Sequence, residues 1–119
     1  MCHVLIIEDE PLIAMDLEYL LEREGASSFS FAASQEEAVC AARTQRPDII
    51  TSDVTLIEGT GPGAIASIRA TMGAIPVVFI TATPKDCCAE DQLTRTLSKP
   101  LNRPVIASVF RELREASCC

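Results

Sequence analysis

Four places along the chain carry side chains that together could support phosphoryl transfer. They are an acidic run, Glu8-Asp9-Glu10, a carboxylate at Asp53, a hydroxyl at Thr81 and an ammonium at Lys99. Neighbouring carboxylates repel one another, and Mg²⁺, which prefers oxygen ligands, relieves that repulsion. A carboxylate can also act as a nucleophile toward phosphorus, while Mg²⁺, Lys99 and Thr81 stabilise the phosphoryl oxygens. These residue types predict Mg²⁺-assisted transfer of a phosphoryl group to Asp53.

Three of these places follow or end a short apolar run typical of a buried strand, and Lys99 follows a weaker strand pattern. We expect strands at 4–7, 28–33, 47–53, 76–81 and 94–98, the second more exposed and the last weak. Helical spacing of apolar residues predicts helices over 11–24 and 103–116. A capping pattern at Ser34 to Glu37 opens another helix, to about residue 45. A further helix carries Ala64, Ile65 and Ile68.

Five strands that alternate with helices predict an α/β fold with one doubly wound parallel sheet covered on both faces. In such a sheet, binding sites lie outside the carboxyl ends of the strands. Glu8, Asp53, Thr81 and Lys99 all follow or end a predicted strand, so we expect them to meet at one rim. No repeat or linker interrupts the 119 residues, and we expect a single domain over 1–119.

Composition narrows the class of protein. The chain is 48% hydrophobic, which indicates a globular core, and its net charge of −7 argues against binding nucleic acid through phosphates. No apolar stretch is long enough to cross a membrane, and the N-terminal residues do not resemble a signal peptide. We therefore expect a cytoplasmic protein, as a monomer or a weak dimer. The six cysteines and the single histidine, His3, lack zinc-site spacing, which favours thiols without a metal or redox role.

The whole chain resembles the receiver domain of two-component response regulators, on the acidic pair Glu8-Asp9, Asp53, Thr81-Ala82 and Lys99-Pro100. This resemblance implies a flavodoxin-like sheet of order 2-1-3-4-5, with Asp53 as phosphoacceptor, Thr81 as switch hydroxyl and a sensor histidine kinase as donor. It also implies Mg²⁺ bound by Asp9 and Asp53, by Glu8 through water and by the backbone carbonyl of Thr55. Chemistry beyond self-phosphorylation and autodephosphorylation is not expected, so the chain is not predicted to be an enzyme.

The segments 5–18 and 78–82 more narrowly resemble receivers of general-stress-response regulators, some of which are stand-alone. Because no further domain follows, we expect a stand-alone receiver that acts as a phosphate sink or as an adaptor for a downstream regulator. Kinase docking is expected on the first helix, where Ile13, Ala14, Met15 and Leu17 would present an apolar patch.

Two features depart from the common receiver. Many receivers have an aromatic residue three positions before the lysine, where this chain has Thr96, so signal relay by an aromatic rotamer is not expected. The segment between Thr81 and Lys99 contains Pro84 and Cys87-Cys88 and leaves room only for a shortened or irregular fourth helix.

Two alternative functions stay open. One is a degenerate receiver that acts as a phosphorylation-independent binding module. The other is a phosphatase with an Asp nucleophile, in which Thr55 would stand where such enzymes need a second Asp.

Overall fold

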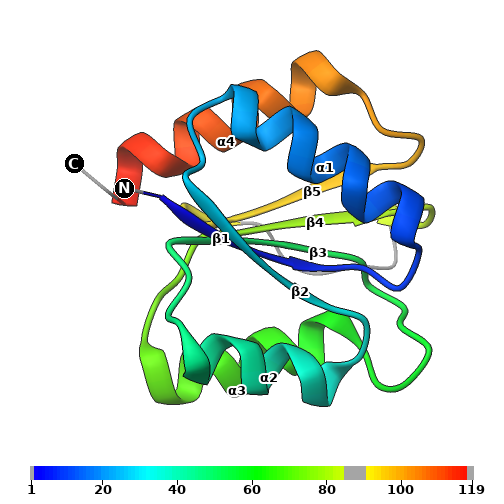
Figure 1. The fold of residues 1–119 in the computed structure, drawn as a ribbon, viewed down its shortest axis with the longest axis vertical. Helices are drawn as coiled ribbons and strands as arrows, with labels where there is room; N and C mark the ends of the chain where they lie inside the picture. The colour runs from blue at the N-terminus through cyan, green and yellow to red at the C-terminus, as the bar shows by residue number, and fades with distance from the viewer. Residues whose placement is uncertain (1, 85–90, 118–119) are drawn as a thin grey trace.

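The computed structural model describes residues 2–84 and 91–117. Strands and helices alternate along the chain (Figure 1). The elements are β1 (His3–Ile7), α1 (Pro11–Arg23), β2 (Ser28–Ala32), α2 (Gln35–Thr44), β3 (Ile49–Ser52), α3 (Gly61–Met72), β4 (Val77–Thr81), β5 (Thr94–Ser98) and α4 (Arg103–Ser117). These elements match the predicted ones, with small shifts at their ends.

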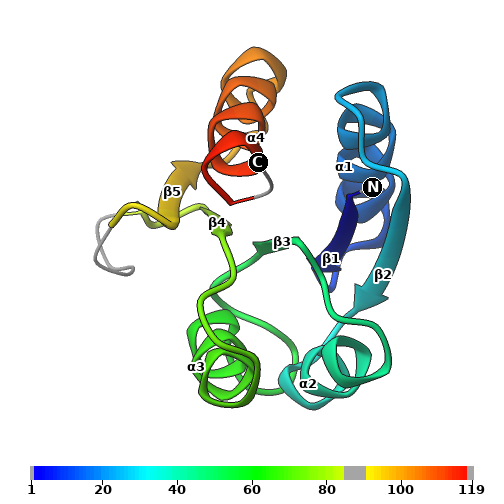
Figure 2. The same ribbon diagram turned by 90° about the vertical axis from the view of Figure 1, so that its left-hand side faces the viewer.

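The five strands form one sheet in the order β2-β1-β3-β4-β5, and every neighbouring pair is parallel. Helices α1 and α4 cover one face of the sheet and α2 and α3 cover the other (Figure 2). The predicted doubly wound sheet and its strand order are confirmed. The expected shortened or irregular fourth helix falls largely on residues 85–90, which lie outside the described residues.

Two apolar clusters, one on each face of the sheet, explain the continuous apolar runs. Val4 and Ile6 of β1 belong to the cluster that also contains Leu17 and Phe110. Leu5 and Ile7 belong to the opposite cluster, with residues of α2 and α3. Successive strand side chains point to opposite faces, so a strand buried on both sides needs apolar residues at every position.

Hydroxyl side chains cap the starts of α2 and α3. The Ser34 hydroxyl accepts a hydrogen bond from the Glu37 backbone N–H at 3.1 Å, at the start of α2. The Thr60 hydroxyl accepts one from the Gly63 N–H at 3.0 Å, at the start of α3. Both caps satisfy N–H groups that a helix start leaves without partners.

Among the described residues, no helix has both the length and the apolar character needed to cross a bilayer. Cys2 is buried in the core and Cys40 is exposed. The other cysteines, Cys87, Cys88, Cys118 and Cys119, lie outside the described residues.

Candidate functional site

The carboxyl ends of β1, β3 and β5 place three charged side chains together. Glu8 follows β1, Asp53 follows β3 and Lys99 follows β5. The Asp53 N–H donates to the Ile7 carbonyl at 2.9 Å, and the Lys99 N–H donates to the Thr81 carbonyl at 2.8 Å. These bonds extend the sheet pairing beyond the strand ends, so the sheet itself fixes the backbone from which Asp53 and Lys99 project.

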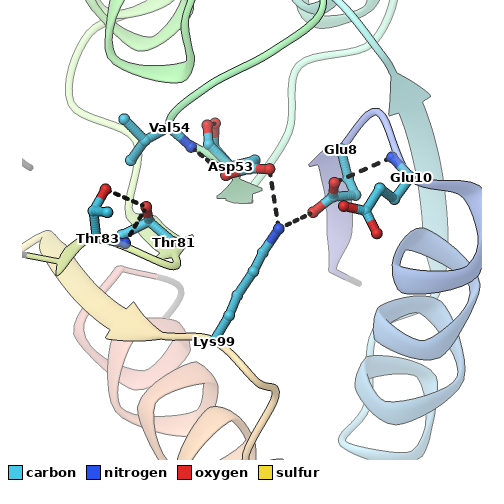
Figure 3. Close-up of polar contacts among 8 residues, drawn as sticks. Glu8, Glu10, Asp53, Val54, Thr81, Thr83 and Lys99 are labelled. Atoms are coloured by element: carbon cyan, nitrogen blue, oxygen red, sulfur yellow. Dashed lines mark hydrogen bonds and ion pairs between the residues drawn. The ribbon is translucent and has the colours of Figure 1, made fainter.

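Lys99 lies between the two carboxylates. Its Nζ is 3.1 Å from Asp53 Oδ2 and 3.5 Å from Glu8 Oε1 (Figure 3). Burial lowers the pKa of the Lys99 ammonium, but the hydrogen bond to Asp53 and the charge of Glu8 outweigh burial and raise it above its ordinary value. Lys99 is therefore a fixed positive charge in contact with both carboxylates.

Glu8 is the most buried of the acidic residues at this rim, with a side chain only 2% exposed. Burial raises the pKa of Glu8 to about 7, against the lowering effects of the Glu10 N–H, which donates to Glu8 Oε2 at 3.1 Å, and of Lys99. The nearby Asp53 charge raises this pKa further. A carboxylate with a raised pKa in such a place gains from an additional cation.

Asp9 and Glu10 complete an acidic cluster with Glu8. One carboxylate oxygen from each residue lies within 4.8 Å of the others. Asp9 is half-buried and Glu10 is exposed, so the cluster opens toward solvent. An all-oxygen donor set with access for water suits Mg²⁺, which binds through one or two carboxylates and keeps several waters.

The Asp53 carboxylate is anchored but accessible. Its Oδ1 accepts a hydrogen bond from the Val54 N–H at 2.7 Å, and its side chain is 12% exposed. The Ser52 hydroxyl donates to the Asp53 carbonyl at 2.8 Å, which holds the backbone of the same residue. The carboxylate is therefore held in place, and one side of it can be reached from solvent.

Thr81 ends β4 at the same rim, but its hydroxyl bonds elsewhere. Thr81 Oγ1 accepts a hydrogen bond from the Thr83 N–H at 3.1 Å and lies 3.5 Å from Thr83 Oγ1 (Figure 3). No hydrogen bond joins Thr81 Oγ1 to Asp53 or Lys99. Sequence analysis did not identify Thr83 as the partner of Thr81. The signal was present, because a threonine hydroxyl often accepts a hydrogen bond from the backbone N–H two residues later.

Thr55 and Thr96 lie at the edges of this arrangement. Thr55 is exposed in the loop after Asp53 and forms an isolated antiparallel bridge with Thr60. Thr96, the position where many receivers have an aromatic residue, is half-buried in the middle of β5.

The prediction that four residues of α1 form an exposed apolar patch is wrong for two of them. Ala14 and Leu17 are buried in the core, and Ile13 packs partly buried against it. Met15 is 63% exposed, as predicted, and the other large apolar residues exposed on this helix are Leu12 and Tyr19. Apolar spacing alone did not show which side of α1 packs on the sheet and α4.

A hollow of about 430 Å³ lies between α1 and the end of β2. Its lining includes apolar residues of both elements, such as Met15 and Phe31. It also includes four acidic residues, Glu8, Asp9, Glu18 and Glu37. Phe31 is 49% exposed. The acidic cluster therefore borders an apolar surface.

Residues 4–111 match the family model of the response regulator receiver domain. Among curated proteins, the chain is 45% identical over 84 residues to the phyllosphere-induced regulator PhyR of Methylorubrum extorquens, a match that covers 69% of this chain and 31% of that protein. It is 39% identical over 79 residues to the transcriptional regulatory protein PdtaR of Mycobacterium tuberculosis, covering 66% and 38% respectively. The chain thus spans only about a third of these curated relatives.

Solved structures show the same architecture. The PhyR receiver domain of Erythrobacter litoralis superposes with a TM-score of 0.87 at 29% identity, covering 99% of this chain and 93% of that one. The response regulator PhyR of Brucella abortus superposes with a TM-score of 0.85 at 32% identity, covering 98% of this chain and 50% of that one.

Proposed function

The chain belongs to the response regulator receiver domain family, and from this premise we propose that it accepts a phosphoryl group on Asp53. The observation that carries the proposal is the contact between Lys99 Nζ and Asp53 Oδ2 at 3.1 Å, beside the Glu8-Asp9-Glu10 cluster. A partly exposed carboxylate, held by a fixed ammonium and bordered by further carboxylates, meets the needs of a phosphoacceptor site.

In this reaction an oxygen of the Asp53 carboxylate forms a bond to phosphorus. The bond between phosphorus and the donor breaks at the same time, and the donor atom keeps the electron pair. Val54 N–H and Lys99 hold the carboxylate in place for the attack. Lys99 then faces the added negative charge, since an ammonium pairs with a phosphoryl oxygen as it does with a carboxylate.

The donor set at this rim fits Mg²⁺. We expect Asp9 and Asp53 to hold the ion through their carboxylates, Glu8 to hold it through water, and the loop after Asp53 to contribute the Thr55 carbonyl. When bound, Mg²⁺ would neutralise negative charge on the phosphoryl oxygens. Burial raises the pKa of Glu8, and the charge of Lys99 only partly offsets this effect. An additional cation at this place would stabilise the ionised carboxylate, which supports the proposed site.

The phosphorylated state is expected to give the Thr81 hydroxyl a second partner. Its oxygen accepts from the Thr83 N–H in this structure, and a hydroxyl that accepts one bond can still donate another. Donation to a phosphoryl oxygen would move the end of β4 toward Asp53. That shift would distinguish the two states for a partner protein.

A sensor histidine kinase is the proposed donor. Leu12 and Met15 are exposed on α1 next to the acidic cluster, and the hollow lined by Met15 and Phe31 continues this apolar surface. A partner helix could bury this surface while presenting a phosphohistidine to Asp53.

Mass spectrometry of the intact protein tests the proposal. Incubation with Mg²⁺ and a small phosphodonor such as acetyl phosphate should add the mass of one phosphoryl group, and EDTA should prevent the addition. If no mass is added while the protein remains folded, the chain is instead a binding module that works without phosphorylation.

Two roles of the phosphorylated form, a phosphate sink and a signalling adaptor, are separated by reconstitution. A sink lowers the phosphorylation of a rival regulator that shares the kinase, and it needs little signal relay. Thr96 in place of an aromatic residue supports this role. If phosphorylation of the rival is unchanged and the phosphorylated chain binds another protein, the role is that of an adaptor.

A further inference from the structure

The loop that joins β3 to α3, residues 53–60, starts and ends at the proposed phosphorylation site. Thr55 and Thr60 pair as an isolated antiparallel bridge that closes the loop. The Gly61 N–H donates to the Val54 carbonyl at 2.9 Å. The far end of the loop is thereby bound to the residues that directly follow Asp53.

The backbone of Asp53 is in direct contact with the start of α3. A Cβ atom at Gly61 would lie 1.9 Å from the Asp53 carbonyl oxygen and 2.4 Å from Ser52 Oγ. Real Cβ contacts are not this short, so only glycine fits. Because no space separates the two segments, a displacement of the Thr60–Gly61 backbone must displace Asp53 as well.

Gln35, which lies outside this loop, holds it by two hydrogen bonds. Its backbone N–H donates to the Glu58 carbonyl at 3.0 Å, and its side-chain Oε1 accepts from the Thr60 N–H at 3.0 Å. Gln35 is the first residue of α2, whose start is fixed by the Ser34 cap. The loop is therefore attached to a rigid element on the same face of the sheet.

Two glycines leave the space that the Gln35 side chain occupies. A Cβ atom at Gly59 would lie 2.4 Å from Gln35 Cβ, and one at Gly63 would lie 2.7 Å from Gln35 Oε1. Gly59 also has a φ of 81°, a conformation that favours glycine. The loop on one side of Gln35 and the first turn of α3 on the other are both shaped around this side chain.

We propose that Gln35 is a positioning residue for phosphoryl transfer. Through Thr60 it fixes the loop that carries the Thr55 carbonyl, and through the Gly61 contact it fixes the backbone of Asp53. It touches neither the phosphoryl group nor the metal itself. This role rests on the proposed phosphorylation of Asp53.

Two substitutions separate the side-chain bond from the rest of the residue. Gln35→Leu keeps the size of the side chain but removes the acceptor for the Thr60 N–H. Gln35→Glu retains an oxygen that can accept from the Thr60 N–H, so Mg²⁺ affinity and the phosphorylation rate should be largely preserved. The control is Ser27→Ala, because the exposed Ser27 hydroxyl bonds to the Cys2 backbone at the opposite end of the sheet.

Three measurements are made on each protein. In metal-free protein, amide hydrogen exchange at Thr60 should become about threefold to tenfold faster in Gln35→Leu, the effect of losing one hydrogen bond. Mg²⁺ affinity, followed by NMR shifts of the Val54 and Thr55 amides, and the rate of phosphorylation by acetyl phosphate should each fall by a similar factor. Gln35→Glu and Ser27→Ala should stay within about twofold of wild type in Mg²⁺ affinity and rate.

The outcomes distinguish this proposal from the one on which it rests. If the wild type takes no phosphoryl group, the proposed function fails and the role of Gln35 fails with it. If the wild type is phosphorylated and Gln35→Leu matches it in Mg²⁺ affinity and rate, only the role of Gln35 is overturned. An equal loss in Ser27→Ala would also overturn it, because the effect would then reflect general destabilisation.

Discussion

The two ends of the sheet both carry buried polar side chains, but they satisfy them in different ways. At the amino end, His3, Ser28 and Ser30 form a neutral hydrogen-bonded group. At the carboxyl end, Glu8, Asp53 and Lys99 form a charged group in which one ammonium serves two carboxylates. In the first group the hydrogen-bonding groups satisfy one another. In the second group one positive charge faces two carboxylates, so negative charge remains that a bound cation would neutralise.

At the amino end every hydrogen-bonding group of His3 has a partner. Its Nδ1 lies 2.7 Å from Ser28 Oγ and its Nε2 lies 2.7 Å from Ser30 Oγ. Its backbone N–H donates to Asp48 Oδ2 at 2.8 Å. Burial lowers the pKa of His3 and so favours the neutral ring, while the charge of Asp48 acts in the opposite direction. This end of the sheet is built for stability.

Burial of polar residues does not by itself mark a functional site. Buried groups that satisfy one another stabilise a fold, whereas buried like charges are held together at the expense of stability. Of these two groups, only the one at the carboxyl end brings like charges together, at Glu8 and Asp53.

The same Asp-to-Asn change should abolish phosphorylation at the carboxyl end and leave it unchanged at the amino end. Asp53→Asn removes the nucleophile, so the mass added by a phosphodonor should disappear completely. Asp48→Asn retains an oxygen that accepts from the His3 N–H, and its phosphorylation should equal that of wild type. Far-UV circular dichroism should show both variants folded. Undiminished phosphorylation of Asp53→Asn would place the phosphoacceptor elsewhere.

Magnesium should also distinguish the ends. Asp9→Ala should weaken Mg²⁺ binding by at least about tenfold, since even outer-shell partners of a metal contribute that much. At a Mg²⁺ concentration equal to the wild-type Kd, the Mg²⁺-dependent NMR shifts around Asp53 should therefore fall to about a fifth of their wild-type size or less. Asp48→Asn serves as the control with unchanged binding. A titration of Asp9→Ala that overlays the wild-type curve would contradict the proposed ligand set.

Removal of Lys99 should separate phosphorylation from its structural consequence. Lys99→Ala leaves Asp53 able to attack phosphorus, so some phosphorylation should remain, while the NMR shifts that phosphorylation causes in the wild type should be lost. In metal-free buffer the free energy of unfolding should fall by about 1–3 kcal/mol, because two carboxylates lose their partner. Wild-type shifts in the phosphorylated variant would show that Lys99 does not couple the site to the fold.

Which side chains meet could be predicted from the sequence for the carboxyl end of the sheet but not for the amino end. Continuous apolar runs fixed where β1, β3 and β4 stop, and the parallel sheet then brought Glu8, Asp53 and Thr81 to one rim. His3 was assigned no partners, because its contacts with Ser28 and Ser30 depend on the register between two strands. Register follows from packing across the whole sheet, and a single strand sequence does not contain it.

Contacts between loops and helices were also beyond sequence reasoning. The bonds of Gln35 to Glu58 and Thr60 join segments far apart in the chain, and no local pattern indicates them. Likewise, the acidic run did not show that Glu8 would be buried and Glu10 exposed. Glu8 directly follows the buried strand β1, whereas Glu10 directly precedes α1.

The two ends should finally respond to pH with opposite signs, which is the smallest and most specific difference. In metal-free protein the pKa of Glu8 is raised from 4.5 to about 7. As pH falls through 7 toward 4.5, folded Glu8 binds a proton before unfolded Glu8 does, so its contribution to the free energy of unfolding grows.

His3 behaves in the reverse way, because its pKa is lowered from 6.5 by burial. As pH falls below 6.5, the unfolded chain binds the proton first and the contribution of His3 is lost. Urea unfolding in EDTA at pH 8 and pH 5.5 separates the two residues. On acidification Glu8→Gln should lose stability relative to wild type, and His3→Gln should gain it. A change in the same direction for both variants would remove the electrostatic distinction between the two ends of the sheet.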